Sequence, residues 1–245
     1  MRSAARAAGL SAITFALASL AFFALQLAPP MLGFDDTDNP AVSLAFVRAH
    51  PDINVFAGLC LIMMAITLVV TILGVADVVV PRADSLALRC ASTFGLFAAA
   101  LFLVTGGLRI GASGPLLHIA GLRDDWGETA YLAFNVTGQA AGITAIVGLC
   151  LWAIALSVIG RRRRVLPVWL CVLGIVPAFR LLGGTLGPLG VLPDSEFLWI
   201  LGMVSIPGTM VWCLLLGLVL LRRGSSSAGE QGAVPVTAGA QMSRR

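Results

Sequence analysis

The chain has no lysine and little charge of any kind. All 16 of its basic side chains are arginines, and charged residues make up only 11% of its 245 positions. Soluble domains carry about 25% charged residues, and a water-soluble fold of this length cannot hide so much apolar surface. The composition therefore excludes a soluble enzyme, a disordered chain and a nucleic-acid-binding domain.

Side chains suited to metal or redox chemistry are also scarce. There are only two histidines, His50 and His118, and the five cysteines have no CxxC spacing. Paired haem ligands within the apolar segments, the HExxH zinc pattern, GxSxG and the phosphate-binding loop are all missing. We therefore expect no cofactor and no metal, assign no catalytic residue, and regard the cysteines as inert core residues.

What the chain does have is long uncharged apolar stretches. Its residues are 58% hydrophobic, its mean hydropathy is +0.96, and a bilayer-spanning helix needs about 20 apolar residues. Six stretches meet this requirement: 8–29, 53–75, 88–110, 131–159, 165–184 and 197–221. They do not break into the short alternating segments of a membrane barrel. The sequence predicts an all-α polytopic membrane bundle of six transmembrane helices, with one domain over 1–223 and a disordered cytoplasmic tail at 224–245.

The arginines predict the orientation of this bundle. Six crossings place 12 arginines on one side and four on the other. The four are Arg48, Arg109, Arg123 and Arg180. Positive charge in short loops collects on the cytoplasmic side, so both termini are expected in the cytoplasm. The richer side includes a run of four consecutive arginines, Arg161, Arg162, Arg163 and Arg164. We expect this run to contact anionic lipid headgroups rather than nucleic acid.

Two outer loops are predicted, at 30–52 and 113–130. Within the first, Ala41–Ala49 is expected to form a short interfacial helix, capped near Asp38 or Asn39, with Pro40 at its first position. In the second, Pro115 is expected to end the preceding helix.

Two arginines are not explained by topology alone. Arg180 follows 15 uncharged residues after Arg164, so a continuous helix would carry it about 24 Å into the membrane. Arg109 lies near the outer end of the third stretch. One interpretation is that both side chains reach the headgroups or pair with nearby acids. The other is that they converge on an anionic lipid or solute in an outward-facing cavity, because guanidinium binds two oxygens of a phosphate or carboxylate at once.

The fourth stretch contains the other polar cluster. Asn135, Gly138, Gln139 and Gly142 are spaced by three and four residues, so they share one helix face. The simpler interpretation is helix packing through amide hydrogen bonds and a close glycine contact. The alternative is that Asn135 and Gln139 line a polar cavity and bind a ligand together with Arg109 and Arg180.

Two segments carry a family resemblance. The first is RAAGLSAI at 6–13, and the second is RVLPVWLCVLGI at 164–175, with its Leu-Pro-x-Trp-Leu-x-x-Leu-Gly phrase. They resemble a family of bacterial multi-pass membrane proteins classed as a domain of unknown function. The resemblance implies six helices in a bacterial cytoplasmic membrane, and it implies no activity and no catalytic residue.

Three classes of function remain. The absence of chemical motifs favours a non-catalytic membrane protein with an envelope, assembly or regulatory role. The alternative is a small permease, or a binder of an anionic lipid or solute at an outward-facing site. A second alternative is a membrane enzyme that uses outer acids, Asp35, Asp36 and Asp38, together with Arg109. Membrane lipids are the expected partners, and a homo-oligomer or a membrane partner stays open.

Overall fold

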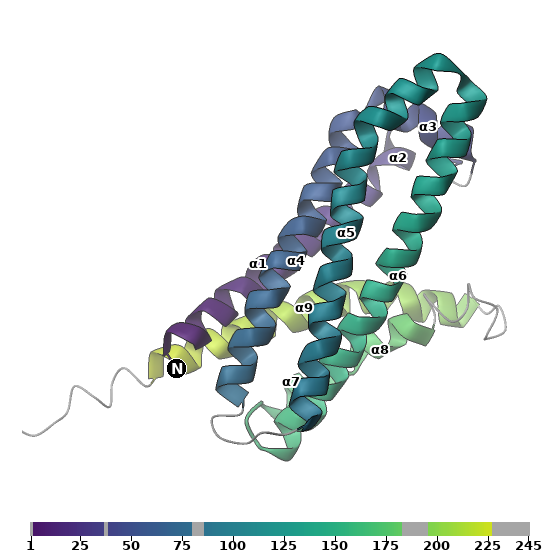
Figure 1. Cartoon of the computed structure of the whole chain (residues 1–245). Coiled ribbons are helices and arrows are strands. Elements are labelled where there is room, and N and C mark those ends of the chain that lie inside the picture. Colours follow the sequence, from purple (N-terminus) through teal and green to yellow (C-terminus); the bar gives the residue numbers. More distant parts are fainter. Residues whose placement is uncertain (1, 37–38, 80–85, 183–195, 227–245) are drawn as a thin grey trace, which may run out of the picture.

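The computed structural model describes residues 2–36, 39–79, 86–182 and 196–226. In these ranges every regular element is a helix (Figure 1), which confirms the all-α class. The helices are α1 (Arg2–Gln26), α2 (Ala28–Met31), α3 (Pro40–Ala49), α4 (Pro51–Val79), α5 (Leu86–Leu122), α6 (Asp124–Arg162), α7 (Val168–Leu173), α8 (Val176–Leu181) and α9 (Glu196–Ser226). The predicted tail lies almost wholly outside the described residues, because α9 includes its first three positions.

Five of these helices, α1, α4, α5, α6 and α9, are long and apolar enough to cross a membrane. The stretch predicted at 165–184 differs, because it forms two helices of six residues each, α7 and α8, rather than one long helix. Pro177 explains the break, since it has no N–H to donate and its ring clashes with the carbonyl four residues earlier.

The hairpin formed by α5 and α6 is longer than the sequence predicted. α5 continues through Pro115 to Leu122, and α6 begins at Asp124, so the predicted loop at 113–130 is wrong. The exposed Pro115 is tolerated because the turns that follow it bury Leu116 and Ala120 against α3. With 37 and 39 residues, the two helices are about 55 and 58 Å long, and they project past α1 and α4 in Figure 1.

The short interfacial helix is confirmed as α3. It begins at Pro40, and the Asn39 side chain accepts a hydrogen bond from the Ala41 N–H at 3.0 Å, as an N-cap does. Its buried Leu44, Phe46 and Val47 form a small core with α5. We call α3 and the adjoining ends of α5 and α6 the distal cap, and the opposite end of the bundle, where α1 begins and α9 ends, the terminal end.

The main core lies toward the terminal end, where the helices approach closely. α1 and α9 run antiparallel, and a Cβ on Gly9 would lie 2.8 Å from the Gly217 carbonyl oxygen. α6 and α9 meet through Trp152 and Trp212, whose ring centroids are 5.7 Å apart in a T-shaped contact. Both indoles are fully buried, so this contact fixes α9 against α6 in this half of the bundle.

Candidate functional site

Arg109 lies on the interior face of α5, between the buried residues Thr105 and Ala112. α4 holds this part of α5 closely. The Asn54 amide donates hydrogen bonds to the Arg109 carbonyl at 3.1 Å and to the Ser113 hydroxyl at 2.9 Å. The backbone that carries the Arg109 side chain is therefore fixed by side-chain contacts from a neighbouring helix.

The Arg109 guanidinium is partly buried and has an unusual set of neighbours. Its Cζ lies 5.4 Å from the centre of the Phe22 ring on α1, a cation–π contact. Tyr131, on α6, lies within electrostatic range. Among the described residues, no carboxylate or other acceptor is hydrogen-bonded to this guanidinium. It is therefore a charged group with one aromatic face covered and its N–H donors unused.

Open space lies at the same level on α6. The α5–α6 pair is in contact at Ala98 and Gly148, and again at Ala120 and Gly127. α5 and α6 run antiparallel, so positions can be matched by counting equally far back along α5 and forward along α6. From the contact of Ala120 with Gly127, this count places Arg109 opposite Gly138. Among the described residues, no atom lies within 4 Å of a Cβ placed on Gly138, or on Gly142 one turn away.

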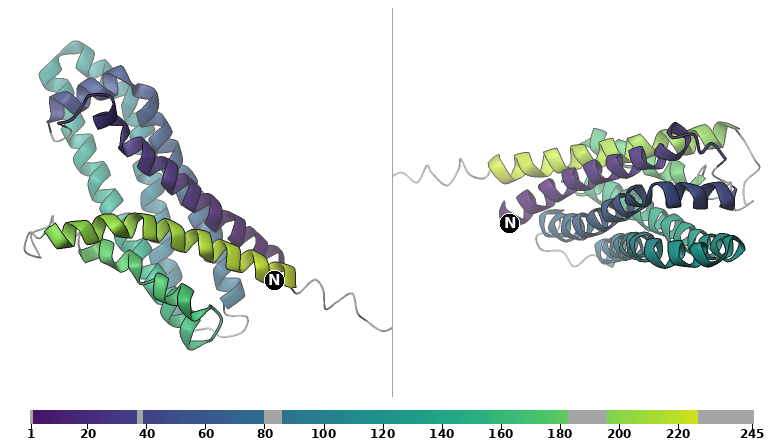
Figure 2. Two further views of the ribbon diagram at one scale, coloured as in Figure 1. Left: turned by 180° about the vertical axis from the view of Figure 1, so that it is seen from behind. Right: turned by 90° about the horizontal axis from the view of Figure 1, so that it is seen from above.

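α9 does not follow α6 along its length. At the terminal end Trp212 of α9 packs on Trp152 of α6, whereas toward the distal cap α9 diverges from α1, α5 and α6 (Figure 2). We call the stretch at the level of Phe22, Arg109, Gly138 and Gly142 the distal groove.

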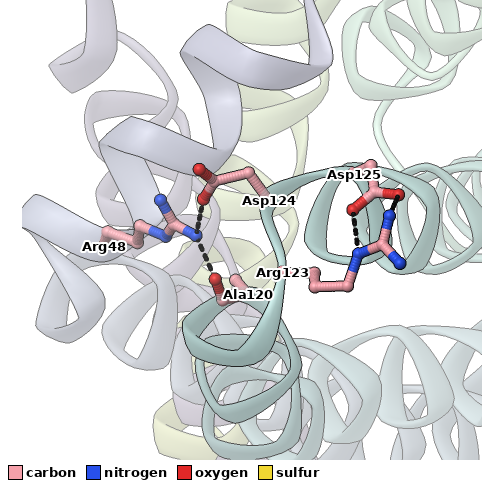
Figure 3. A network of polar contacts seen from close by, with 5 residues as sticks. All are labelled: Arg48, Ala120, Arg123, Asp124 and Asp125. Carbon is pink, nitrogen blue, oxygen red and sulfur yellow. Dashed lines mark hydrogen bonds and ion pairs between the residues drawn. The ribbon is translucent and has the colours of Figure 1, made fainter.

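Two of the other arginines predicted on the outer side, Arg48 and Arg123, have acidic partners in the distal cap. Figure 3 shows Arg48 donating hydrogen bonds to the Ala120 carbonyl at 2.5 Å and to Asp124 at 2.7 Å. Arg123 forms a two-point contact with Asp125, at 3.0 and 2.8 Å. Two of the acids that the sequence offered as partners for Arg109 and Arg180, Asp124 and Asp125, are thus paired with other arginines. Of the other two, Asp194 lies outside the described residues and Glu196 is exposed at the start of α9.

The polar residues of α6 flank the groove without hydrogen-bond partners in the described part of the chain. Asn135 and Gln139 are both exposed. They share an α6 face with Cys150, whose thiol donates to the Pro177 carbonyl of α8 at 3.0 Å. This face therefore packs on α8 near Cys150 and is exposed at Asn135 and Gln139. Helix packing through hydrogen bonds of these two amides is not observed among the described residues.

Arg180 lies apart from Arg109. It is partly buried on α8, within electrostatic range of Cys150. Cys150 and Gly138 are 12 positions apart on α6, which corresponds to about 18 Å along the helix axis. The two arginines are therefore at different levels of the bundle, and only Arg109 belongs to the distal groove.

The acids of the second alternative do not form a site with Arg109 in the described residues. Asp35 and Asp36 are exposed, and Asp38 lies outside the described residues. No cluster of three or more His, Cys, Asp or Glu side chains able to hold a metal ion occurs in the described ranges.

Two contributors to the groove were missed from sequence. Phe22 lies seven residues after Phe15, two turns along the same face of α1, and Phe15 packs on Phe102 of α5. This aromatic spacing was the available signal for Phe22. Asn54 stood out only as a polar residue at a helix end, and nothing in the sequence pairs it with the backbone of Arg109.

The fold and this site define a class, an all-helical protein with five helices long and apolar enough to cross a membrane and an arginine that has no acidic partner among the described residues. The chain belongs to the family described as domain of unknown function (DUF4386), whose model matches residues 7–224. The expected membership of a family of unknown function is thereby confirmed. No curated protein and no solved structure matches the chain.

Proposed function

We propose that this protein is a non-catalytic multi-pass membrane protein that binds an anionic molecule through Arg109 at an outward-facing site. The observation that carries the proposal is the Arg109 guanidinium, which has Phe22 on one face, no acidic partner in the described residues, and open space opposite at Gly138. A binding role is favoured over catalysis because no described acid, thiol or histidine accompanies Arg109 as a reacting group.

The chemistry of the ligand follows from the guanidinium. Arginine stays protonated in proteins and presents its donors as a planar fork. An uncompensated charge within a membrane segment is costly, and a phosphate or carboxylate would offset that cost through two charge-assisted hydrogen bonds. The Phe22 ring restricts the orientation of the Arg109 guanidinium, so this side chain loses less conformational entropy when the ligand binds.

The proposed setting is a bacterial cytoplasmic membrane with both termini in the cytoplasm. The start of α1 and the end of α9 lie together in Figure 1, and the exposed arginines at 161–164 are at the same end. α6 and α9 both end there, and α9 is long and apolar enough to cross a membrane. In the proposed topology the segment between these two helices therefore crosses back. We therefore propose six crossings, the fifth of them broken, with the arginine run on anionic headgroups.

Native mass spectrometry of the full chain, released from nanodiscs that contain phosphatidylglycerol, tests the binding role. The wild-type protein should retain the lipid, and Arg109→Gln should weaken retention about tenfold or more, because hydrogen bonds to charged groups are lost. Arg109→Lys should bind the lipid with intermediate strength. The lysine ammonium keeps the positive charge but lacks the planar pair of donors with which guanidinium binds two oxygens.

Arg123→Gln is the matched control, because it removes an outward arginine that is already paired with Asp125. Its retention of lipid should equal that of the wild type. Equal retention by Arg109→Gln and the wild type, for phosphatidylglycerol and for inorganic phosphate alike, would contradict the proposed function.

A further inference from the structure

Tyr131, the only tyrosine of the chain, has a ring whose position is explained by packing and a hydroxyl that is not used by the fold. The partly buried ring packs against the small apolar core of the distal cap. The hydroxyl makes no hydrogen bond in the described part of the chain, although the hydroxyl of a buried tyrosine usually finds a partner. The packing therefore leaves this polar group available.

Tyr131 lies on the face of α6 that is turned toward Arg109. It precedes Gly138 by seven residues, which is close to two helical turns, so both positions share one face. Gly138 is the residue opposite Arg109, and Tyr131 is also within electrostatic range of the Arg109 guanidinium. Because Gly138 has no side chain and its Cβ position meets no described atom, a ligand held by Arg109 would not encounter a packed contact there.

The polar groups around this position are hydrogen-bond donors. A guanidinium has only donors, and a tyrosine hydroxyl can donate one hydrogen bond. The amide of Asn54 is already engaged, because it donates to the Arg109 carbonyl and to the Ser113 hydroxyl. No carboxylate is bonded to Arg109 or Tyr131 among the described residues. A positively charged set of donors selects an anion with several acceptor oxygens.

The two donor groups come from different helices, and this arrangement discriminates between anions. The guanidinium of Arg109, on α5, is planar and matches the two coplanar oxygens of a carboxylate or two oxygens of a phosphate. The Tyr131 hydroxyl approaches from α6, on the other side of the hairpin. A tetrahedral phosphate presents further acceptor oxygens outside the plane of the guanidinium, whereas a carboxylate has none.

From this arrangement we infer that the Tyr131 hydroxyl is a second ligand-binding group and that the ligand is a tetrahedral oxyanion, a phosphate or a phosphodiester. The guanidinium binds two of its oxygens, and the tyrosine hydroxyl donates to an oxygen outside that plane. The inference rests on the proposed function and adds a binding residue and the class of anion. A phospholipid headgroup and a soluble phosphate offer the same chemistry, and the test separates these two sources.

The class of anion is tested by comparing phosphates with carboxylates of equal charge. The purified full chain, in a neutral detergent, is titrated with a lipid pair, dioleoyl phosphatidylglycerol and dioleoylglycerol hemisuccinate, and with a soluble pair, dimethyl phosphate and acetate. Each phosphate probe should bind about threefold more tightly than its carboxylate counterpart, or better, because it gains one hydrogen bond. Tighter binding of phosphatidylglycerol than of dimethyl phosphate supports a lipid headgroup as the source, and the reverse supports a soluble phosphate.

Tyr131→Phe removes the hydroxyl and keeps the ring that packs on the distal cap. The variant should unfold at the wild-type temperature, bind each phosphate probe about threefold to tenfold more weakly, and lose the preference over carboxylates. Thr137→Val is the matched control, because it removes another hydroxyl from α6, one that donates to the Ala133 carbonyl of the same helix at 2.8 Å. Its affinities should equal those of the wild type.

Because the chain contains a single tyrosine, fluorotyrosine labels position 131 alone. The ¹⁹F resonance should shift when phosphatidylglycerol replaces the carboxylate lipid, and Arg109→Gln should abolish that shift. A tyrosine that served only to pack its ring would show no such dependence on Arg109.

The outcomes separate the two proposals. If Tyr131→Phe binds every probe as the wild type does and the ¹⁹F resonance does not move, while Arg109→Gln weakens binding, the tetrahedral-oxyanion assignment is overturned and the anion-binding function stands. Carboxylates that bind as tightly as phosphates to the wild type would overturn the assignment as well. If Arg109→Gln changes the binding of no probe, both proposals fail.

Discussion

The four arginines predicted on the outer side, Arg48, Arg109, Arg123 and Arg180, illustrate how the surroundings of a side chain set its role. Arg48 and Arg123 are exposed in the distal cap and paired with acids that lie close by. Exposed pairs of this kind contribute little to stability, about 0–1 kcal/mol. Arg109 and Arg180 are partly buried instead, and Arg109 has no acid within bonding distance in the described residues. The same residue type is thus structural in one place and available for a ligand in another.

Gly174, at the end of α7, is a residue for which size decides stability. A Cβ there would collide with the Ser157 hydroxyl and lie 2.8 Å from the Trp212 indole nitrogen, which donates to the Leu170 carbonyl. Gly174→Ala should therefore destabilise the protein by about 1–3 kcal/mol through overpacking, measured as unfolding of the purified protein in detergent. Gly107→Ala is the control, because nothing lies within 4 Å of that position. A loss of stability as large in the control as in Gly174→Ala would contradict the packing argument.

Ser157 carries a buried hydroxyl that has no hydrogen-bond partner in the described part of the chain. An unpaired buried polar group costs about 1–3 kcal/mol, so its removal relieves that cost. We expect Ser157→Ala to be as stable as the wild type or more stable in the same unfolding measurement. Destabilisation of more than about 1 kcal/mol would mean that the hydroxyl makes a bond that this structure does not contain.

Among the elements, α3 is attached to the hairpin by its small apolar core and by the polar contacts of Arg48. Arg48 bonds to the Ala120 carbonyl at the end of α5 and to Asp124 at the start of α6. Arg48→Ala should speed amide hydrogen exchange in 40–49 and change overall stability by less than about 1 kcal/mol, because the pair is exposed. Arg123→Ala should leave that exchange unchanged, since its ion pair joins residues only two positions apart. Equal exchange in α3 for both variants would refute this account.

The elements also show what the sequence predicted and what it did not. Charge-free apolar runs located the five long helices, and Asn39 followed by Pro40 located α3, because these signals act locally. The α5–α6 hairpin was cut short, since Pro115 ordinarily ends a helix and the compensating burial of Leu116 on α3 is a contact between distant segments. Pro177 was visible, but its effect depended on packing of α7 and α8 against α6 and α9.

At the scale of the molecule, the sequence identified Arg109 but not its surroundings. The arginine stood out because it interrupts an apolar stretch. The divergence of α9, the open space at Gly138 and the Phe22 contact all depend on tertiary packing, for which the sequence carries no local signal. Convergence of Arg109 with Arg180 was expected only as one of two interpretations, and the different levels of the two residues argue against it.

The proposed topology makes a prediction for the whole chain. Because α1 begins and α9 ends at the same end of the bundle, fusions of green fluorescent protein to the N-terminus and to the C-terminus should both fluoresce in bacterial cells. Alkaline phosphatase fused at either terminus should stay inactive, since it requires export. One active phosphatase fusion would place that terminus outside and contradict an even number of crossings.

The absence of lysine allows a direct measurement of the central claim, that the side chain at position 109 binds an anionic group such as a phosphate. In the Arg109→Lys variant, ¹⁵N-lysine labels a single side chain, because the chain contains no other lysine. Solid-state NMR in phosphatidylglycerol bilayers then measures ³¹P–¹⁵N dephasing at that one amine.

We predict strong dephasing in the Arg109→Lys variant, with the amine in hydrogen-bonding range of a phosphate oxygen, at about 2.8 Å. The Arg123→Lys variant is the control, since position 123 lies about 21 Å further along the hairpin, and it should show none. Absence of dephasing in the Arg109→Lys variant, in bilayers where the protein is folded, would contradict the account.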